Sequence, residues 1–350
     1  MKCNVLIGLI FFVFVSYNSG TSQSLSNTGF SSFRSDRWFD VIRVVSDSEI
    51  YAPGFVKDSV AGDYAYVAKW NGIIWQQLGT KIFNDRIRDI AVVSSNEIYV
   101  CGAFHNDSDK TYLAKWNGSD WSEVGILNTV DAVKHIRAFS SSDIFIDVYG
   151  WDGLSQSQVF RWDGDNWNKL GNIGEYRYDH FYVTDSKEVY VAGGYFFTGN
   201  NTVPFILNWD GKNWNEMGKF KRDIKYSGKA GPMVFKNNNE IYTAISHCVE
   251  KTKTYSSKIY MWENGKWIPK ISEDNDMVGS YIRCDKKGGF YANANWNIQK
   301  WDGKSWQVIR GSEVDDYIFS FEILPNGNIY YTGAFTDTKG KYYIKRVHSK

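Results

Sequence analysis

The sequence predicts an all-β protein, a seven-bladed β-propeller of four-stranded antiparallel blades. Two observations lead to this prediction: a tryptophan-bounded hairpin motif recurs six times, and a strand motif built around Ile-Tyr recurs seven times. A period of about 40–50 residues is the length of one propeller blade. The composition agrees, because aromatic residues make up 17% of the 350 residues, as in a well-packed globular chain.

The hairpin motif is first seen as Trp70-Asn-Gly-Ile-Ile-Trp75. Asn or Asp followed by Gly suits a turn that requires positive φ. A large aromatic side chain at the same place in every blade is what packing between blades requires. We therefore expect a structural role for these residues rather than sugar stacking. The tryptophans of the six copies are Trp70 and Trp75, Trp116 and Trp121, Trp162 and Trp167, Trp209 and Trp214, Trp262 and Trp267, and Trp301 and Trp306.

The strand motif precedes each hairpin, as in Asn96-Glu-Ile-Tyr99. In the second unit the β-branched and aromatic residues predict strands over 87–93, 97–104, 112–116 and 121–124. No long stretch has the apolar periodicity of a helix. Short strands joined by polar turns at this spacing favour a radial arrangement with only short strand edges.

The seventh unit contains only three predicted strands, 320–324, 328–335 and 342–347, and lacks the outer hairpin strand. The segment 30–38 precedes the inner strand of the first unit and is free to supply the missing strand. We therefore predict a ring closed by pairing between the N-terminal segment and the last blade. A six-bladed ring with the last segment as a tail is the alternative.

The first 22 residues have the pattern of a signal peptide. Lys2 precedes the apolar run 5–15, and small residues follow up to Ser22. The run is short for a membrane span, although a retained anchor is the alternative. We expect a single propeller domain over 23–350, without a membrane span after cleavage. We expect an extracellular location, with the cell surface or the periplasm as alternatives.

The cysteines, charges and histidines indicate which bonds and partners to expect. Cys101, Cys248 and Cys284 are an odd, scattered set, so free thiols are expected, with a Cys248–Cys284 pair as the alternative. The net charge of +1 argues against nucleic acid. The five histidines form no metal-ligand spacing, and 106–109 lacks the full pattern of a calcium loop. We therefore expect no metal, no cofactor and a monomer. The glycosylation sequons are Asn106, Asn117 and Asn200.

The segments Ile98–Gly102 and Val189–Gly194, each followed by an aromatic strand and a Trp, resemble the kelch repeat. Kelch blades form the propeller of galactose oxidase-like proteins. The Trp-Asp-Gly-x-x-Trp ending also resembles repeats of fungal cortical polarity-marker proteins and of secreted bacterial propellers. The resemblance implies the fold of nearly all of 23–350. It does not imply one activity, because such folds carry many functions.

The candidate binding residues come from alternation along the inner strands. Aligned on the Ile-Tyr motif, one column holds Val41, Asp89, His135, His180, Pro232, Tyr281 and Ser320, and the next holds Arg43, Ala91, Arg137, Tyr182, Val234, Arg283 and Glu322. Their charged, histidine and tyrosine members are the candidates: Arg43, Asp89, His135, Arg137, His180, Tyr182, Tyr281, Arg283 and Glu322. Irregular connections expected on the same face span 55–63, 104–111, 150–158, 194–204, 219–231 and 247–257. Variable loops on a rigid scaffold commonly carry binding sites.

These features favour a secreted, non-catalytic propeller that binds a glycan or an extracellular protein through its loop face. A pocket for an anionic or polyhydroxylated ligand is one interpretation of the columns, and a water-filled channel lined by paired charges is the other. A propeller enzyme, either a glycoside hydrolase or an oxidase acting at the channel mouth, is an alternative. A structural surface or adhesion repeat protein is a third. We predict no catalytic residue.

Overall fold

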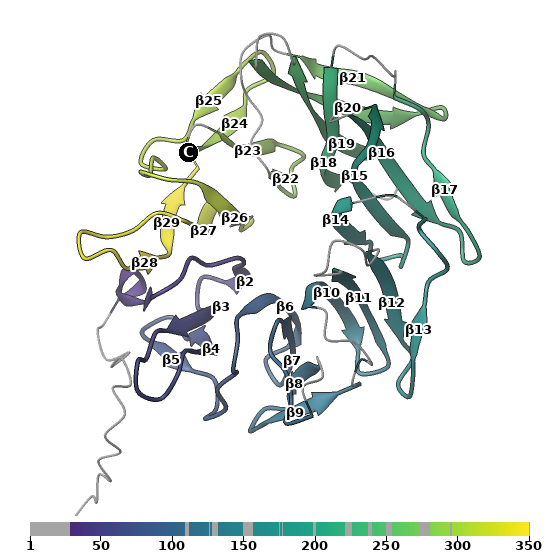
Figure 1. The fold of residues 1–350 in the computed structure, drawn as a ribbon. Helices are drawn as coiled ribbons and strands as arrows, with labels where there is room; N and C mark the ends of the chain where they lie inside the picture. Colours follow the sequence, from purple (N-terminus) through teal and green to yellow (C-terminus); the bar gives the residue numbers. More distant parts are fainter. Residues whose placement is uncertain are drawn as a thin grey trace, which may run out of the picture.

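Seven β-sheets surround a central axis in the computed structural model (Figure 1). The structure describes residues 29–108, 112–125, 127, 132–149, 157–174, 176, 178–198, 201–220, 226–236, 240–249, 254–272, 281–294 and 296–349. The only helical element within these ranges is the 3-10 turn η1 (Phe30–Ser32). The all-β, seven-bladed prediction is confirmed, and the six-bladed alternative is wrong.

Each of the first six blades is a four-stranded antiparallel meander whose strands follow chain order from the axis outward. Blades 1–3 are β2 (Arg43–Ser46), β3 (Glu49–Val56), β4 (Tyr64–Trp70), β5 (Trp75–Gln77); β6 (Ile87–Ser94), β7 (Glu97–Gly102), β8 (Leu113–Trp116), β9 (Trp121–Val124); and β10 (Ala132–Ser140), β11 (Asp143–Tyr149), β12 (Gln158–Trp162), β13 (Trp167–Lys169). Blades 4–6 are β14 (Tyr178–Val183), β15 (Val189–Thr198), β16 (Asn201–Trp209), β17 (Trp214–Glu216); β18 (Tyr226–Lys236), β19 (Glu240–Val249), β20 (Thr254–Glu263), β21 (Lys266–Ser272); and β22 (Ile282–Cys284), β23 (Phe290–Ala294), β24 (Asn297–Trp301), β25 (Trp306–Val308).

The seventh blade contains β26 (Ile318–Ile323), β27 (Asn328–Gly333) and β29 (Lys345–His348). Just before β29, β28 (Tyr342–Tyr343) pairs with the N-terminal β1 (Arg34–Ser35). The predicted pairing of the N-terminal segment with the last unit is therefore confirmed, but β1 and β28 form a separate two-stranded sheet, so β1 does not become the fourth strand of the seventh blade. Polar contacts support the same seam, because Arg34 Nε lies 2.6 Å from the Asp337 carboxylate and Lys341 pairs with Asp36.

The paired tryptophans connect neighbouring blades. Within each hairpin the two rings lie 5.0–5.8 Å apart, and in blades 2 to 5 the indole N–H of the second tryptophan donates to a carbonyl of the preceding blade. In blades 2 to 5 these donors are Trp121, Trp167, Trp214 and Trp267, at 2.6–2.7 Å from the carbonyl oxygens of Leu78, Gly125, Leu170 and Met217. In blade 1 the acceptor is Phe30, 2.9 Å from Trp75 Nε1. The N-terminal segment thus supplies to blade 1 the carbonyl acceptor that the preceding blade supplies elsewhere.

Hydrophobic clusters lie between adjacent blades rather than inside one blade. Tyr51 and Val67 of blade 1 pack with Ile90 and Val100 of blade 2. At the seam, Phe33 joins residues of blades 1 and 7. A blade buries its faces only against its two neighbours, so the ring as a whole holds the inner strands in place.

The two faces of the ring differ. The turns between the first and second strands and between the third and fourth lie on one face, called here the hairpin face; the remaining connections lie on the other, called the loop face. On the loop face, much of the expected irregular structure in blades 4 and 5 is instead strand. β15 pairs with β16 as far as Thr198 and Asn201, and β19 pairs with β20 as far as Val249 and Thr254.

The same correction applies to 219–231, because β18 begins at Tyr226 and pairs with β19 from there. Continuous backbone pairing outweighs the turn signals of Gly194 and Pro204, which lie opposite each other in the β15–β16 ladder. Pro204 is tolerated because β17 pairs only with Leu207–Trp209, so β16 is an edge beyond it.

Some sequence predictions fall outside the described residues, namely the signal peptide over 1–22, most of the irregular connection 150–158 and the sequon at Asn200. Cys101 and Cys284 are free thiols, so the alternative Cys248–Cys284 pair is not formed. Within the described ranges, no helix is long and apolar enough to cross a membrane.

Candidate functional site

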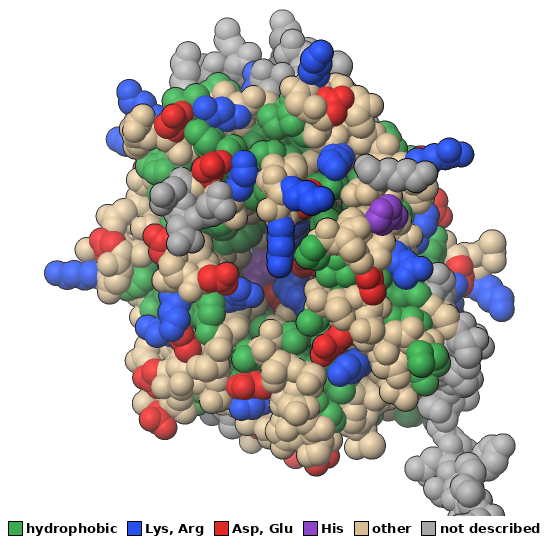
Figure 2. Space-filling view, turned by 180° about the vertical axis from the view of Figure 1, so that it is seen from behind, with side chains coloured by type: hydrophobic (Ala, Val, Ile, Leu, Met, Phe, Trp, Pro, Cys, Tyr) green, Lys and Arg blue, Asp and Glu red, His purple; other side chains and the backbone are tan. Residues whose placement is uncertain are grey.

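A cavity of about 1050 Å³ lies along the axis of the ring. All nine candidate residues line it: Arg43, Asp89, His135, Arg137, His180, Tyr182, Tyr281, Arg283 and Glu322. Figure 2 shows the hollow at the centre of one face, with basic, acidic and histidine side chains gathered in it. Of the fourteen aligned inner-strand positions only Pro232 is not part of the lining.

A recurrent β-bulge adds residues that the alignment missed. Register shifts interrupt the inner strand just before Asp89, His135, His180 and Ser320. A bulge turns an extra side chain toward the same side as its neighbour. As a result the residue preceding each column position also lines the cavity: Arg88, Lys134, Asp179 and Phe319, together with Asp40 of blade 1. Pro232 lies within the corresponding irregularity of blade 5, between Ala230 and Met233.

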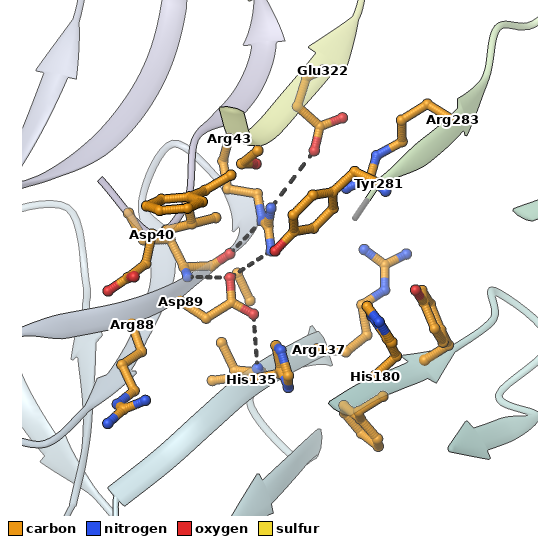
Figure 3. A pocket seen from close by; sticks show the side chains of 18 of the residues that line it. Asp40, Arg43, Arg88, Asp89, His135, Arg137, His180, Tyr281, Arg283 and Glu322 are labelled. Atoms are coloured by element: carbon orange, nitrogen blue, oxygen red, sulfur yellow. Dashed lines mark hydrogen bonds and ion pairs between the residues drawn. The ribbon is translucent and has the colours of Figure 1, made fainter. Parts of the chain in front are cut away.

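Three of the candidates form a structural network (Figure 3). The Arg43 guanidinium lies 2.5 Å from the Asp89 carboxylate and 3.6 Å from that of Glu322, and Arg43 Nε donates to the Ile90 carbonyl. The buried Asp89 carboxylate also accepts the backbone N–H groups of Ile90 and, from blade 3, Ile136. These contacts join four blades, so these charges serve the scaffold.

Two further candidates have partners outside the cavity centre. His135 Nδ1 lies 3.0 Å from both carboxylate oxygens of the buried Asp147. The Arg137 guanidinium donates to Asp185 at 2.7 Å, but both side chains are exposed. An exposed ion pair contributes little and exchanges readily. His135 is therefore fixed, whereas Arg137 is available to a ligand.

The remaining four candidates, His180, Tyr182, Tyr281 and Arg283, come from blades 4 and 6 and are called here the open sector. Among the described residues, Arg283 makes no ion pair with a carboxylate. Its guanidinium donates to the Ile282 carbonyl at 3.1 Å and lies 5.8 Å from the ring centres of Tyr281 and Phe321. Figure 3 shows Arg283 reaching into the cavity.

The neighbours of Arg283 are neutral at physiological pH. Desolvation in the cavity lowers the pKa of His180 well below its usual value, although the Asp179 carboxylate opposes the shift. The same cause raises the pKa of Tyr182 to about 12, and its hydroxyl accepts the Met233 N–H at 3.0 Å. Burial also raises the pKa of Tyr281. The open sector thus holds one cation among neutral hydrogen-bonding groups.

Charges at the loop-face end of the cavity come from the bulge residues. Burial raises the pKa of Asp40, although the positive charges of Arg86 and Arg88 act to lower it. Burial also lowers the pKa of Arg88. The Arg88 Nε is buried without a hydrogen-bond partner. Over the described lining there are five basic residues (Arg43, Arg88, Lys134, Arg137 and Arg283) and four acidic ones (Asp40, Asp89, Asp179 and Glu322).

No group of three or more His, Cys, Asp or Glu side chains that could hold a metal ion is found in the described part of the chain. The open sector offers a guanidinium, two phenol groups and a neutral imidazole. Such a set can bind a carboxylate and hydroxyl groups.

No family model matches the chain, and no curated protein matches it. The kelch-like assignment therefore stays a prediction. Solved structures share the fold. The β-propeller domain of the Trilobed protease from Pyrococcus furiosus has a TM-score of 0.58 at 9% identity, over 92% of this chain and 97% of that chain.

YCF48 from Cyanidioschyzon merolae gives a TM-score of 0.58 at 11% identity, over 92% and 98% of the two chains. An oligogalacturonate lyase in complex with manganese gives 0.61 at 10% identity, over 87% and 86%. At such identities these similarities establish the propeller fold alone.

Proposed function

We propose that this protein is an exported, non-catalytic propeller that binds an acidic glycan in its central cavity. The observation that supports this most is Arg283, a cavity cation without a carboxylate partner among the described residues. Arginine is suited to two parallel hydrogen bonds to a carboxylate. Export rests on the signal-peptide pattern of residues 1–22.

The rest of the open sector supports a polyhydroxylated ligand. The Tyr281 ring flanks the guanidinium, and its hydroxyl and the His180 imidazole add hydrogen-bonding groups. Tyrosine is common at binding interfaces because its ring packs against apolar surface while its hydroxyl forms hydrogen bonds. The cavity is at the upper end of the size range of small-molecule sites, which is about 300–1,000 Å³.

Three of the four carboxylates that line the cavity are held in ion pairs, including Asp179 with Lys229 at 3.0 Å, and this favours binding over hydrolysis. Glycosidases commonly need two carboxyl groups free to act on the substrate. Here Asp89 and Glu322 are both tied to Arg43. We therefore assign these two residues to the scaffold and not to acid–base catalysis.

The test is titration calorimetry with glucuronate and with glucose. We expect glucuronate alone to bind, and Arg283→Gln to weaken binding about 10- to 100-fold, since a hydrogen bond to a charged group is worth about 1.5–3 kcal/mol. Arg310→Gln, an exposed arginine outside the cavity, is the matched control. Equal affinity for glucose, or no effect of Arg283→Gln, would refute the acidic-ligand proposal. Turnover of a glycan, or copper in the purified protein, would favour the enzyme alternative.

A further inference from the structure

Exposed aromatic side chains lie on the loop face beside the cavity. Trp38, Trp296 and Tyr317 have exposed fractions of 38%, 53% and 65%. Trp38 precedes the inner strand of blade 1, Tyr317 precedes that of blade 7, and Trp296 lies in the β23–β24 connection of blade 6. All three positions belong to the loop face, and we call them the aromatic platform.

The platform is continuous with the cavity. Trp38 lines the cavity and packs against Phe319, another lining residue, with 6.4 Å between ring centres. Tyr317 is two residues before Phe319. Trp296 is linked to the same connection, because its carbonyl accepts the Val314 N–H at 2.9 Å. Three residues of chain span at most about 11 Å, so Trp296 lies within reach of one extended ligand.

The backbone at Trp296 indicates that this side chain is presented for a purpose other than packing. Its φ is +62°, in the left-handed region where glycine or asparagine is usual. A bulky residue there costs about 1 kcal/mol or more. No hydrophobic cluster of the described residues includes Trp296, and more than half of it is exposed. An indole kept in solvent at a strained position suggests a ligand contact.

The charge near Tyr317 is opposite to that of the open sector, whereas at the other end of the platform the Arg37 guanidinium lies 5.2 Å from the Trp38 ring centre. Glu313, Asp315 and Asp316 lie in the connection between Val308 and Ile318 that carries Tyr317. That connection is fixed, because the buried Ser312 hydroxyl bonds to both the N–H and the carbonyl of Ile298. A carboxylate-bearing sugar would be repelled there, whereas a neutral sugar ring would stack on the aromatic side chains.

We infer that the ligand is an oligosaccharide made of neutral sugars with one acidic sugar at its end. The terminal carboxylate binds Arg283 in the cavity, and the neutral sugars lie across Trp38, Tyr317 and Trp296. This inference rests on the proposed function, and it specifies in addition the length of the bound oligosaccharide and the position of its charge. It excludes a uniformly acidic polyuronate as the preferred ligand.

The experiment compares three probes by calorimetry: glucuronate, a neutral tetrasaccharide capped with one glucuronate, and a glucuronate tetramer. The capped oligosaccharide should bind at least tenfold more tightly than glucuronate, and the uniform tetramer should bind more weakly than the capped one. Trp296→Gly should reduce the affinity for the capped oligosaccharide about tenfold, equivalent to about 1.4 kcal/mol. It should leave glucuronate binding unchanged.

Trp296→Gly also separates a ligand role from a structural one. Glycine relieves the positive φ, so the variant should be at least as stable as the parent. Tyr317→Ala provides a second platform variant, and Ile73→Ala, an exposed apolar residue of a hairpin turn, is the control. If glucuronate does not bind the parent protein, the proposed function is wrong. If glucuronate binds but platform variants leave oligosaccharide affinity unchanged, or the uniform tetramer binds best, only the platform inference is wrong.

Discussion

Asp47 should be a main determinant of ring stability. It lies in the turn between β2 and β3 of blade 1, and its carboxylate accepts three hydrogen bonds from blade 7. The donors are Asn326 Nδ2 at 2.5 Å, Asn328 Nδ2 at 2.8 Å and the Tyr330 hydroxyl at 2.5 Å. The corresponding residue of blade 2, Ser95, is exposed and is therefore a matched control.

The expected loss in Asp47→Ala follows from these bonds. A hydrogen bond to a charged group contributes about 1.5–3 kcal/mol when buried. The Asp47 seam is half-buried and Asn326 is exposed, so roughly 1 kcal/mol for each bond is appropriate, giving about 3 kcal/mol in total. Asp47→Asn should lose only part of this, because an amide oxygen still accepts. Ser95→Ala should change stability by less than about 0.5 kcal/mol.

The pH dependence provides a second measurement. Desolvation would raise the pKa of Asp47, but the hydrogen bonds from Tyr330, Asn328 and Asn326 outweigh it and hold that pKa below its usual value. A carboxyl with a lowered folded-state pKa stabilises above its unfolded-state pKa of about 3.9, and this contribution disappears as pH falls through the folded-state value.

Urea denaturation of the parent and Asp47→Ala should therefore differ by a constant amount between pH 5 and 8, and the difference should narrow as pH falls below about 4. Equal stability of Asp47→Ala and Ser95→Ala at pH 7 would refute this account of the seam.

Three further predictions concern stability. Gly102→Ala should destabilise strongly, by more than about 3 kcal/mol in urea denaturation, because its Cβ would lie 2.1 Å from the Arg86 carbonyl oxygen; a loss below 1 kcal/mol would contradict the clash. Trp167→Phe keeps a ring but leaves the Gly125 carbonyl without its 2.6 Å donor, so about 1–2 kcal/mol should be lost. His180 is held neutral by a lowered pKa, so the unfolded chain binds more protons, and stability should fall as pH drops below about 6.5. His180→Gln should reduce that fall, and an unchanged pH profile would show that another group causes it.

The fold was predictable because its signals are local and repeated. Each Ile-Tyr strand and each Trp hairpin can be located without knowledge of distant residues, and strands predicted in blade 2 agree with β6 to β9 within two residues. The closure was predictable for a related reason: six hairpins against seven inner strands leave one strand position open. The long hairpin in blade 4 was missed because Gly194 and Pro204 are turn signals that the β15–β16 pairing overrides.

The candidate site was only partly predictable. Strict alternation along the inner strands places Arg283 and Tyr182 correctly toward the axis, but it has no place for bulge residues such as Arg88. The pairing of Arg43 with Asp89, 46 residues away, depends on the angle between blades and cannot be derived from either sequence segment alone. Which charges neutralise one another, and which stay available, is decided by the ring geometry.

The closure by β1 also has a consequence for how the chain folds. Its contacts join residues 303 positions apart, as in Arg34 with Asp337. Bringing such distant segments together in an unfolded chain costs about 5 kcal/mol in loop entropy. Blades already stacked in order bring the two ends close and remove most of that cost. We therefore expect the seam to form last in folding and to open first in unfolding. Backbone amides of β1 and β28 should then exchange hydrogen faster than those of the blades on the opposite side of the ring.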